Sequence, residues 1–208
     1  MKDSYTKKEV AEITGLPYRN IQFYAEQGVV VPEIEQAGGR GKFRRYSNRN
    51  LMAFIIAGEL AQYGVTVGEI RKIILSFLPF WEMKVPGDTS GTFEKVPDGK
   101  VLSLFSEITF TLRIGRTKDN TQVVQWRVGS DDLQRASFTF SIVTSPDGGK
   151  ILHLQNNQKD EGPYTITMDE NQKKIENYDL EALLKDGLVS FVYISVDELI
   201  TEALKRMP

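Results

Sequence analysis

The stretch Glu9-Val-Ala-Glu-Ile-Thr-Gly-Leu-Pro-Tyr-Arg-Asn-Ile-Gln-Phe-Tyr24 decides the fold of the first part of this 208-residue chain. Gly15 stands between two apolar segments, where it can end a helix in the left-handed conformation that glycine adopts most cheaply. Pro17 suits the first turn of a second helix, because its missing N–H would be unpaired there anyway. Two short helices joined by a glycine turn have helix-turn-helix spacing.

The first helix should begin at Thr6, which forms a capping box with Glu9. Its inward residues are Val10 and Ile13. Ile21, together with Phe23 or Tyr24, supplies the apolar side of the second helix. The outward side chains of that second helix are then Arg19, Asn20 and Gln22.

A glycine-rich segment follows at Gln36–Tyr46, in which basic and aromatic residues alternate after the glycines. This pattern predicts a β-hairpin. A phosphate-binding loop is the competing interpretation of Gly39–Lys42, but its spacing is too short and Phe43 stands where such loops need Ser or Thr. The hairpin is therefore the better prediction.

Two further helices complete this region. Ser47 can cap a third helix that runs to about Tyr63, and Thr66 with Glu69 forms a second capping box that starts a fourth. The fourth helix has an apolar stripe made of Val67, Ile70, Ile73, Ile74, Phe77 and Leu78.

Residues 5–78 resemble the DNA-binding domain of the MerR family of transcriptional regulators. The resemblance rests on the two helices and their turn, then Tyr24-Ala-Glu-Gln-Gly28, Lys42-Phe-Arg-Arg-Tyr-Ser47 and Tyr63-Gly-Val-Thr-Val-Gly-Glu-Ile70, all in one order. It implies a winged helix-turn-helix domain that binds a double-stranded promoter as a homodimer and acts with RNA polymerase. In the family, the second helix enters the major groove and the wing grips the backbone.

By residue, the resemblance places Arg19 on DNA, Tyr24 on the backbone, and Arg44 and Tyr46 in the wing. The full predicted DNA-binding set is Arg19, Asn20, Gln22, Tyr24, Lys42, Arg44, Arg45 and Tyr46. A solvated basic surface is the alternative for the arginines, and core packing is the alternative for the two tyrosines.

The sequence departs from the family pattern at Gln22, where an arginine is usual. Glutamine can pair with adenine N6 and N7 but brings no charge for phosphate. The operator preference that the family would imply is therefore not carried over to this chain.

A second departure follows the fourth helix, because Leu78-Pro-Phe-Trp-Glu-Met-Lys-Val-Pro-Gly87 breaks the long dimerisation helix that family members commonly have. Trp81 and its neighbours can serve as an interdomain packing patch or as a replacement dimer contact. We predict a DNA-binding domain at 1–80, a linker at 81–94 and a second domain at 95–208.

After the linker the apolar period changes to two, which predicts strands. They fall at 108–114, 123–128, 138–142, 151–154, 164–168 and 188–194, with a strong turn at Ser145–Gly149, a short helix at Asp179–Lys185 and a last helix capped by Ser195. The predicted fold class is α+β: an N-terminal all-α winged helix-turn-helix domain followed by a mostly antiparallel β domain with C-terminal helices. We identify no family for this second half.

Composition and charge limit the chemistry. The chain has no Cys and one His, so we expect no thiolate metal site, no cofactor and no enzymatic activity. His153 and the aromatic residues Trp126, Phe138, Phe140 and Tyr164 fit structural roles better than a catalytic base or a ligand pocket. Residues 1–80 carry 11 Lys and Arg against 8 Asp and Glu, and the rest carry 15 against 20, so the basic surplus lies where DNA binding needs it.

The sequence leaves two functions open. The first is a sequence-specific transcriptional regulator whose C-terminal domain binds an unknown small-molecule effector or makes the dimer. The second is a protein- or ligand-binding module whose winged domain does not bind DNA. No signal peptide or run of eighteen apolar residues is present, so we expect a cytoplasmic protein without a membrane partner.

Overall fold

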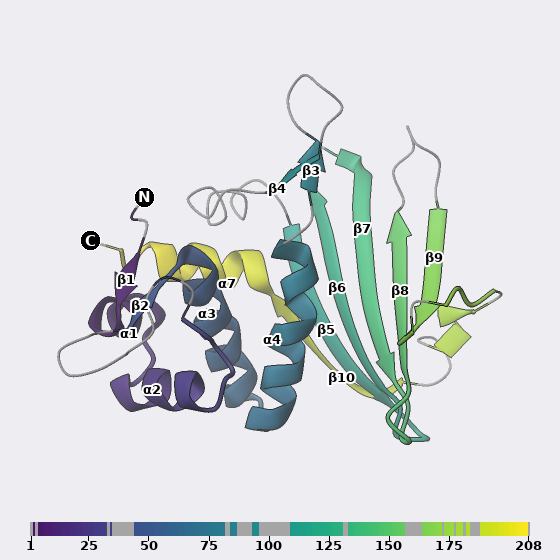
Figure 1. Cartoon of the computed structure of the whole chain (residues 1–208), viewed down its shortest axis with the longest axis horizontal. Coiled ribbons are helices and arrows are strands. Elements are labelled where there is room, and N and C mark those ends of the chain that lie inside the picture. Colours follow the sequence, from purple (N-terminus) through teal and green to yellow (C-terminus); the bar gives the residue numbers. More distant parts are fainter. Residues whose placement is uncertain are drawn as a thin grey trace. The chain divides into compact units, whose positions relative to one another are not determined.

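The computed structural model describes most of the chain in two compact units (Figure 1). Unit 1 comprises Met1–Ser106 with Glu198–Pro208, and unit 2 comprises Glu107–Asp197. The described residues are 2, 4–32, 34, 44–81, 84–86, 93–95, 109–130, 133–156, 164–171, 173–176, 178–180, 182–183 and 188–207.

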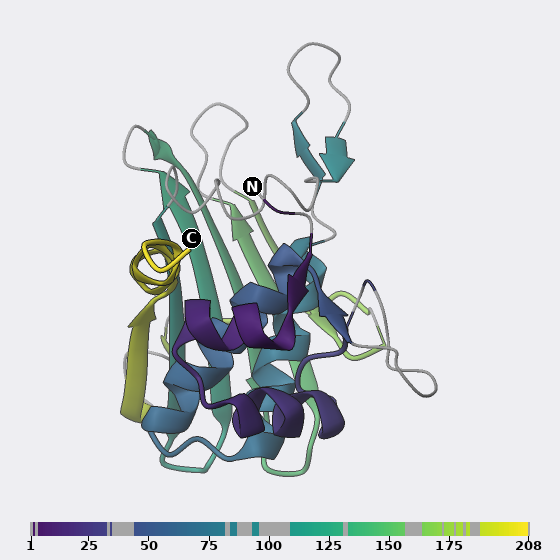
Figure 2. The same ribbon diagram turned by 90° about the vertical axis from the view of Figure 1, so that its left-hand side faces the viewer.

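The first two helices are α1 (Lys7–Thr14) and α2 (Tyr18–Glu26), which lie side by side in unit 1 (Figure 2). The predicted capping box at Thr6 and Glu9 is present, and Gly15 ends α1 with φ 73°. Pro17 precedes α2 as its extended N-cap residue, with ψ 137°, one position earlier than predicted. The local sequence signals therefore define both ends of the turn.

Two longer helices, α3 (Asn48–Gln62) and α4 (Val67–Trp81), supply much of the core of unit 1. The Ser47 hydroxyl accepts a hydrogen bond from the backbone N–H of Asn50 and caps α3. Leu51, Phe54 and Ile56 have no exposed surface. The second predicted capping box also forms, because the Glu69 backbone N–H donates to the Thr66 hydroxyl and the Thr66 backbone N–H donates to the Glu69 carboxylate, each at 3.4 Å.

A short strand pair joins the start of unit 1 to the residues that precede α3. Strand β1 (Tyr5–Thr6) pairs antiparallel with β2 (Arg45–Tyr46). The predicted hairpin at 36–46 has only its last three residues, 44–46, among those described. Of these, Arg45 and Tyr46 pair with Thr6 and Tyr5 in the N-terminal segment of the chain.

Helix α4 continues through Pro79 and ends at Trp81. Strands β3 (Lys84–Pro86) and β4 (Phe93–Lys95) follow and pair antiparallel with each other, over and just beyond the region predicted as a linker. None of the helices in the described part of the chain is long and apolar enough to cross a membrane.

Unit 2 is built on a six-stranded antiparallel sheet, as the sequence predicted. Its strands are β5 (Thr109–Thr117), β6 (Gln122–Ser130), β7 (Leu133–Thr144), β8 (Lys150–Asn156), β9 (Tyr164–Asp169) and β10 (Leu188–Ser195). They lie in the order β10-β5-β6-β7-β8-β9. The chain therefore runs as a meander from β5 to β9 and returns to the opposite edge.

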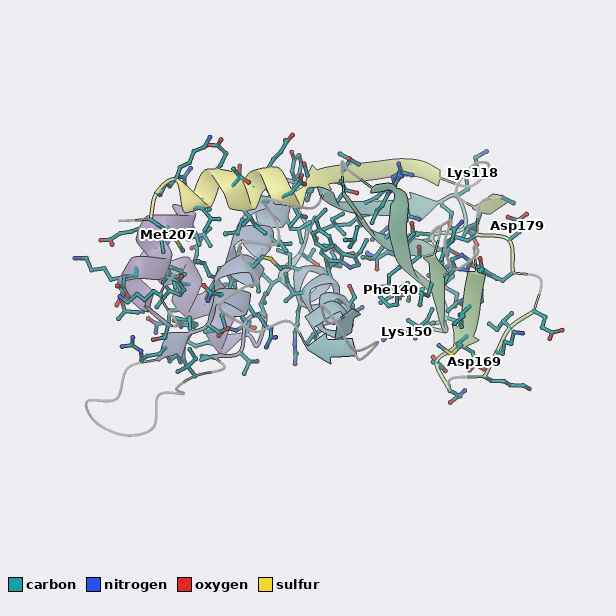
Figure 3. All side chains as sticks on the ribbon, turned by 90° about the horizontal axis from the view of Figure 1, so that it is seen from above. Lys118, Phe140, Lys150, Asp169, Asp179 and Met207 are labelled. Carbon is teal, nitrogen blue, oxygen red and sulfur yellow. The ribbon has the colours of Figure 1, made fainter. Side chains whose placement is uncertain are left out.

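Alternating residues separate the two faces of this sheet. Phe110 and Trp126 are buried on one face and their rings stack with centroids 5.5 Å apart. Phe140, labelled in Figure 3, is half-buried on the neighbouring strand, where it pairs with Trp126 in the register. The opposite face carries a smaller core around Val123, Val143 and Leu180.

Helix α7 (Val196–Leu204) begins directly after β10, without a linker. Its inward face includes Ile200 and Ala203, and both are buried. The Ser195 hydroxyl donates to the Asp197 carboxylate at 2.9 Å in the first turn. From Glu198 onward the helix belongs to unit 1, so the chain contributes to that unit twice. The fold is thus α+β, a helical region followed by an antiparallel sheet and a C-terminal helix.

Candidate nucleic-acid interface

The outward face of α2 follows from the two residues that anchor it. Ile21 and Tyr24 are 0 % and 4 % exposed, so the helix cannot rotate without opening the core. Arg19 and Gln22 therefore point to solvent, and Asn20 is half-buried. The structure also settles which neighbour completes the apolar side, because Phe23 is 43 % exposed whereas Tyr24 is buried.

Gln22 is held by side chains on both sides. The Lys7 ammonium donates to Gln22 Oε1 at 2.8 Å, and Gln22 Nε2 donates to Glu26 Oε1 at 2.7 Å. Lys7 also lies over the Tyr18 ring, with Nζ 3.8 Å from the centroid, a cation–π contact. The contact of Lys7 with Gln22 was not predicted, because Lys7 belongs to the preceding helix and no local pattern links the two residues.

Arg44 and Tyr46 lie close to the same residues. Tyr46 is fully buried, with its ring edge-on to Phe54 at 5.1 Å. Burial raises the pKa of Tyr46, while the nearby Arg44 guanidinium opposes that rise. Among the described residues, no side chain meets the geometry of a hydrogen bond to the Tyr46 hydroxyl.

Lys7 and Arg44 also influence each other electrostatically. Burial lowers the pKa of Lys7, the positive charge of Arg44 lowers it further, and Glu26 acts in the opposite direction. We call Lys7, Tyr18, Arg44 and Tyr46 the basic cluster. Two cations beside a buried hydroxyl form an arrangement that an anion such as a phosphate oxygen would stabilise.

Arg45 and Tyr24 have structural contacts in addition to their predicted roles. The Arg45 guanidinium donates from Nε to the Ser4 hydroxyl at 2.9 Å, which holds β2 against the N-terminal segment. Tyr24 packs in the core with its pKa raised by burial. The remaining predicted residue, Lys42, lies outside the described residues.

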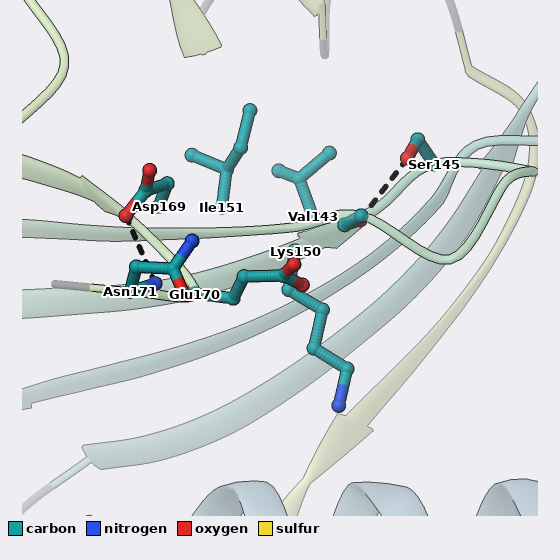
Figure 4. A pocket seen from close by; sticks show the side chains of 8 residues that line it. Val143, Ser145, Lys150, Ile151, Asp169, Glu170 and Asn171 are labelled. Carbon is teal, nitrogen blue, oxygen red and sulfur yellow. Dashed lines mark hydrogen bonds between the residues drawn. The ribbon is translucent and has the colours of Figure 1, made fainter. Parts of the chain in front are cut away.

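Unit 2 offers a pocket of about 260 Å³ at the ends of β7, β8 and β9 (Figure 4). Its lining includes Lys150 and Asp169, and Asp169 Oδ1 already accepts from the backbone of Asn171 at 2.9 Å. Cavities that hold drug-sized ligands usually exceed about 300 Å³ and bring several polar groups together. This shallow pocket therefore carries no assignment of an effector.

His153 is buried in the sheet and its Nδ1 lies 2.9 Å from the Thr167 hydroxyl on β9. The ring also lies 6.2 Å from that of Tyr178. These contacts support the structural role expected from the sequence. Within the described residues, no group of three or more His, Asp and Glu side chains is arranged to hold a metal ion.

Comparison with known proteins assigns the helical region. Residues 5–76 match the profile described as "MerR HTH family regulatory protein". Over 67 residues the chain is 31 % identical to the uncharacterized HTH-type transcriptional regulators Mb1861 of Mycobacterium bovis and Rv1830 of Mycobacterium tuberculosis. The match covers 32 % of this chain and 30 % of the length of each relative.

Proposed function

The chain carries a MerR-family helix-turn-helix domain over residues 5–76, and on this basis we propose that the protein is a sequence-specific DNA-binding regulator of transcription. The observation that carries the proposal is the exposed face of α2, where Arg19 and Gln22 stand beside the basic cluster. Arginine and glutamine read base edges in the major groove, and neighbouring cations neutralise phosphates.

In this proposal the protein acts in the cytoplasm on double-stranded promoter DNA, as a homodimer and with RNA polymerase. The winged element would include Lys42, Arg44, Arg45 and Tyr46, with Arg44 on the DNA backbone and the buried Tyr46 packed behind it. Asn20 and Gln22 would approach bases from α2, and Tyr24 would add a backbone contact at the rim of the core.

Unit 2 is proposed to bind an effector or to make the dimer, and not to act as an enzyme. Support for a dimer role comes from α4, which ends at Trp81 and is followed by the β3–β4 pair. A dimer contact must then use another surface, and the six-stranded sheet is the largest regular element available for it.

The test is a titration of the full chain against labelled duplex from the region upstream of its own gene, with a scrambled duplex as control. Fluorescence anisotropy at several salt concentrations should show preference for the native duplex and an affinity that falls steeply with salt. Arg19→Ala should weaken binding without changing the circular dichroism spectrum. Equal, weak binding to both duplexes would contradict the proposal.

A second function is favoured by one observation. Gln22 already has hydrogen-bond partners within the protein, which is what a helix-turn-helix domain that no longer reads DNA could also show. The protein would then be a protein- or ligand-binding module. A monomer by light scattering with no affinity for any duplex at low salt would support this alternative over DNA binding.

A further inference from the structure

The amide of Gln22 is oriented by charges at both of its ends. Oε1 accepts from the Lys7 ammonium and Nε2 donates to the Glu26 carboxylate, at 2.8 and 2.7 Å. Reversing the amide would place Nε2 against a cation and Oε1 against an anion. Because both contacts would become repulsive, the electrostatics favour one orientation.

Lys7 is itself held in place. Its ammonium lies 3.8 Å above the centre of the Tyr18 ring, and Tyr18 is the first residue of α2. The charge of Glu26 favours the charged form of Lys7 and raises its pKa, whereas the charge of Arg44 lowers that pKa. The contact with the Tyr18 ring and the hydrogen bond to Gln22 together hold Lys7 beside the amide.

The chemistry that remains on Gln22 is specific. A primary amide has two N–H donors and an oxygen with two lone pairs. After the bonds to Lys7 and Glu26, one donor and one lone pair remain. In the major groove adenine presents one acceptor, N7, and one donor, N6–H, whereas guanine presents two acceptors. A fixed donor and acceptor therefore match adenine and mismatch guanine.

We propose that Lys7 and Glu26 are positioning residues that fix the amide of Gln22, so that α2 selects adenine at one position of each DNA half-site. This inference rests on the proposed function, because it applies only if α2 enters the major groove. It assigns a role in base selection to residues on two helices, of which only Gln22 would touch a base.

The experiment begins with selection of preferred duplexes from a random pool by the full chain. Comparison with Gln22→Ala identifies the base position whose selectivity depends on Gln22. The selected duplex and its three single-base variants at that position are then titrated with each protein. Wild type should prefer adenine there by about 5- to 150-fold. Lys7→Met and Glu26→Ala should reduce that ratio to within about threefold, the size expected when the amide can rotate. Glu26→Gln keeps an acceptor for Nε2 and should retain most of the preference.

Lys8→Met is the matched control. Lys8 lies on the same helix, is 80 % exposed in its side chain and pairs with Glu12 at 3.7 Å, away from Gln22. Its loss should weaken binding to all duplexes equally and leave the base ratio unchanged. Circular dichroism melts of each variant would separate a change in base preference from a loss of folding.

The outcomes separate the two proposals. If Lys7→Met and Glu26→Ala keep the wild-type preference for adenine, the positioning role is wrong, but sequence-specific binding still stands. Selection of guanine at the Gln22 position would overturn it as well. If wild type enriches no sequence, the proposed function fails and this inference falls with it.

Discussion

Leu16, in the turn between α1 and α2, packs on the backbone of Gly58 in α3, where a Cβ would lie 2.8 Å from Leu16 Cδ2 and 3.3 Å from Cγ. Gly58 is buried, so the turn of the helix-turn-helix approaches α3 at a point where an added Cβ would force Leu16 to shift. The position of the turn between α1 and α2 therefore depends on the small size of Gly58 in the core of unit 1.

Gly58→Ala should destabilise unit 1 by about 1–3 kcal/mol, because the overpacking outweighs the helix propensity of alanine. Urea unfolding followed by helical circular dichroism measures this change. Gly68→Ala in α4 is the control, since no described atom lies within 4 Å of the added Cβ. That substitution should be neutral or stabilising by up to about 1 kcal/mol. If the two substitutions changed the free energy of unfolding equally, the Leu16 side chain would be able to move away from the new Cβ without cost.

Tyr46→Phe should separate stability from DNA binding. The hydroxyl is buried beside the Arg44 guanidinium, but no contact to it among the described residues meets hydrogen-bond geometry. A buried hydroxyl without a well-formed hydrogen bond costs free energy in the folded state. Its removal should leave the free energy of unfolding unchanged or raise it by about 1 kcal/mol, while DNA affinity falls. Tyr63→Phe, at a tyrosine that is 56 % exposed, should change neither. A clear loss of stability in Tyr46→Phe would mean that the hydroxyl is paired in solution.

Arg44 and Arg45 should respond differently to substitution by alanine. Arg44→Ala should lower duplex affinity and reduce the slope of log K against log salt by about one, as for the loss of one phosphate contact. Arg45→Ala should also remove the bond to Ser4 and lower the free energy of unfolding by about 1 kcal/mol. Stability measured by urea and affinity measured by anisotropy distinguish the two. If both variants showed the same changes in free energy of unfolding and in duplex affinity, the two arginines would not have these different roles.

Glu9 should make unit 1 sensitive to acid. Its pKa is lowered from 4.5 to about 2, first by the hydrogen bond from Lys2 and then by the Thr6 amide. A lowered pKa in the folded state stabilises the protein above pH 4.5, and this contribution disappears as the pH falls from 4.5 to about 2.

Glu9→Gln keeps the capping acceptor but removes the charge. At pH 7 it should lower the free energy of unfolding by roughly 1 kcal/mol, allowing for solvent screening. The difference from wild type should shrink as the pH falls toward 2. Glu12→Gln, at a side chain that is 56 % exposed, provides the control. A constant difference at all pH values would show that the charge of Glu9 is not the cause.

The features that were predicted from sequence are mostly local. The capping boxes at Thr6 and Thr66 join residues three apart, and Gly15 needs only its own backbone conformation. The sheet was predictable because its alternation runs through whole strands, although its order required the structure. Periodicity could not choose between Phe23 and Tyr24, since either neighbour can complete a helical stripe.

The candidate site was predicted only in part because its contacts span the sequence. Lys7 meets Gln22 across 15 residues, and Arg45 meets Ser4 across 41. No short pattern encodes either pair. The sequence therefore identified the side chains that face outward, while the partners that orient them came from the packing of α1 on α2 and of β1 on β2.

The return of α7 to unit 1 sets the order in which that unit can be completed during synthesis. Residues 198–207 emerge from the ribosome only after every strand of unit 2 has been made. Until then Gly15 lacks Arg206, whose guanidinium lies so near that a Cβ on Gly15 would be 2.8 Å from Nη1. The helix-turn-helix therefore acquires its last packing partner after translation of the sheet, and a nascent chain that misfolds in the sheet would delay the completion of the unit proposed to bind DNA.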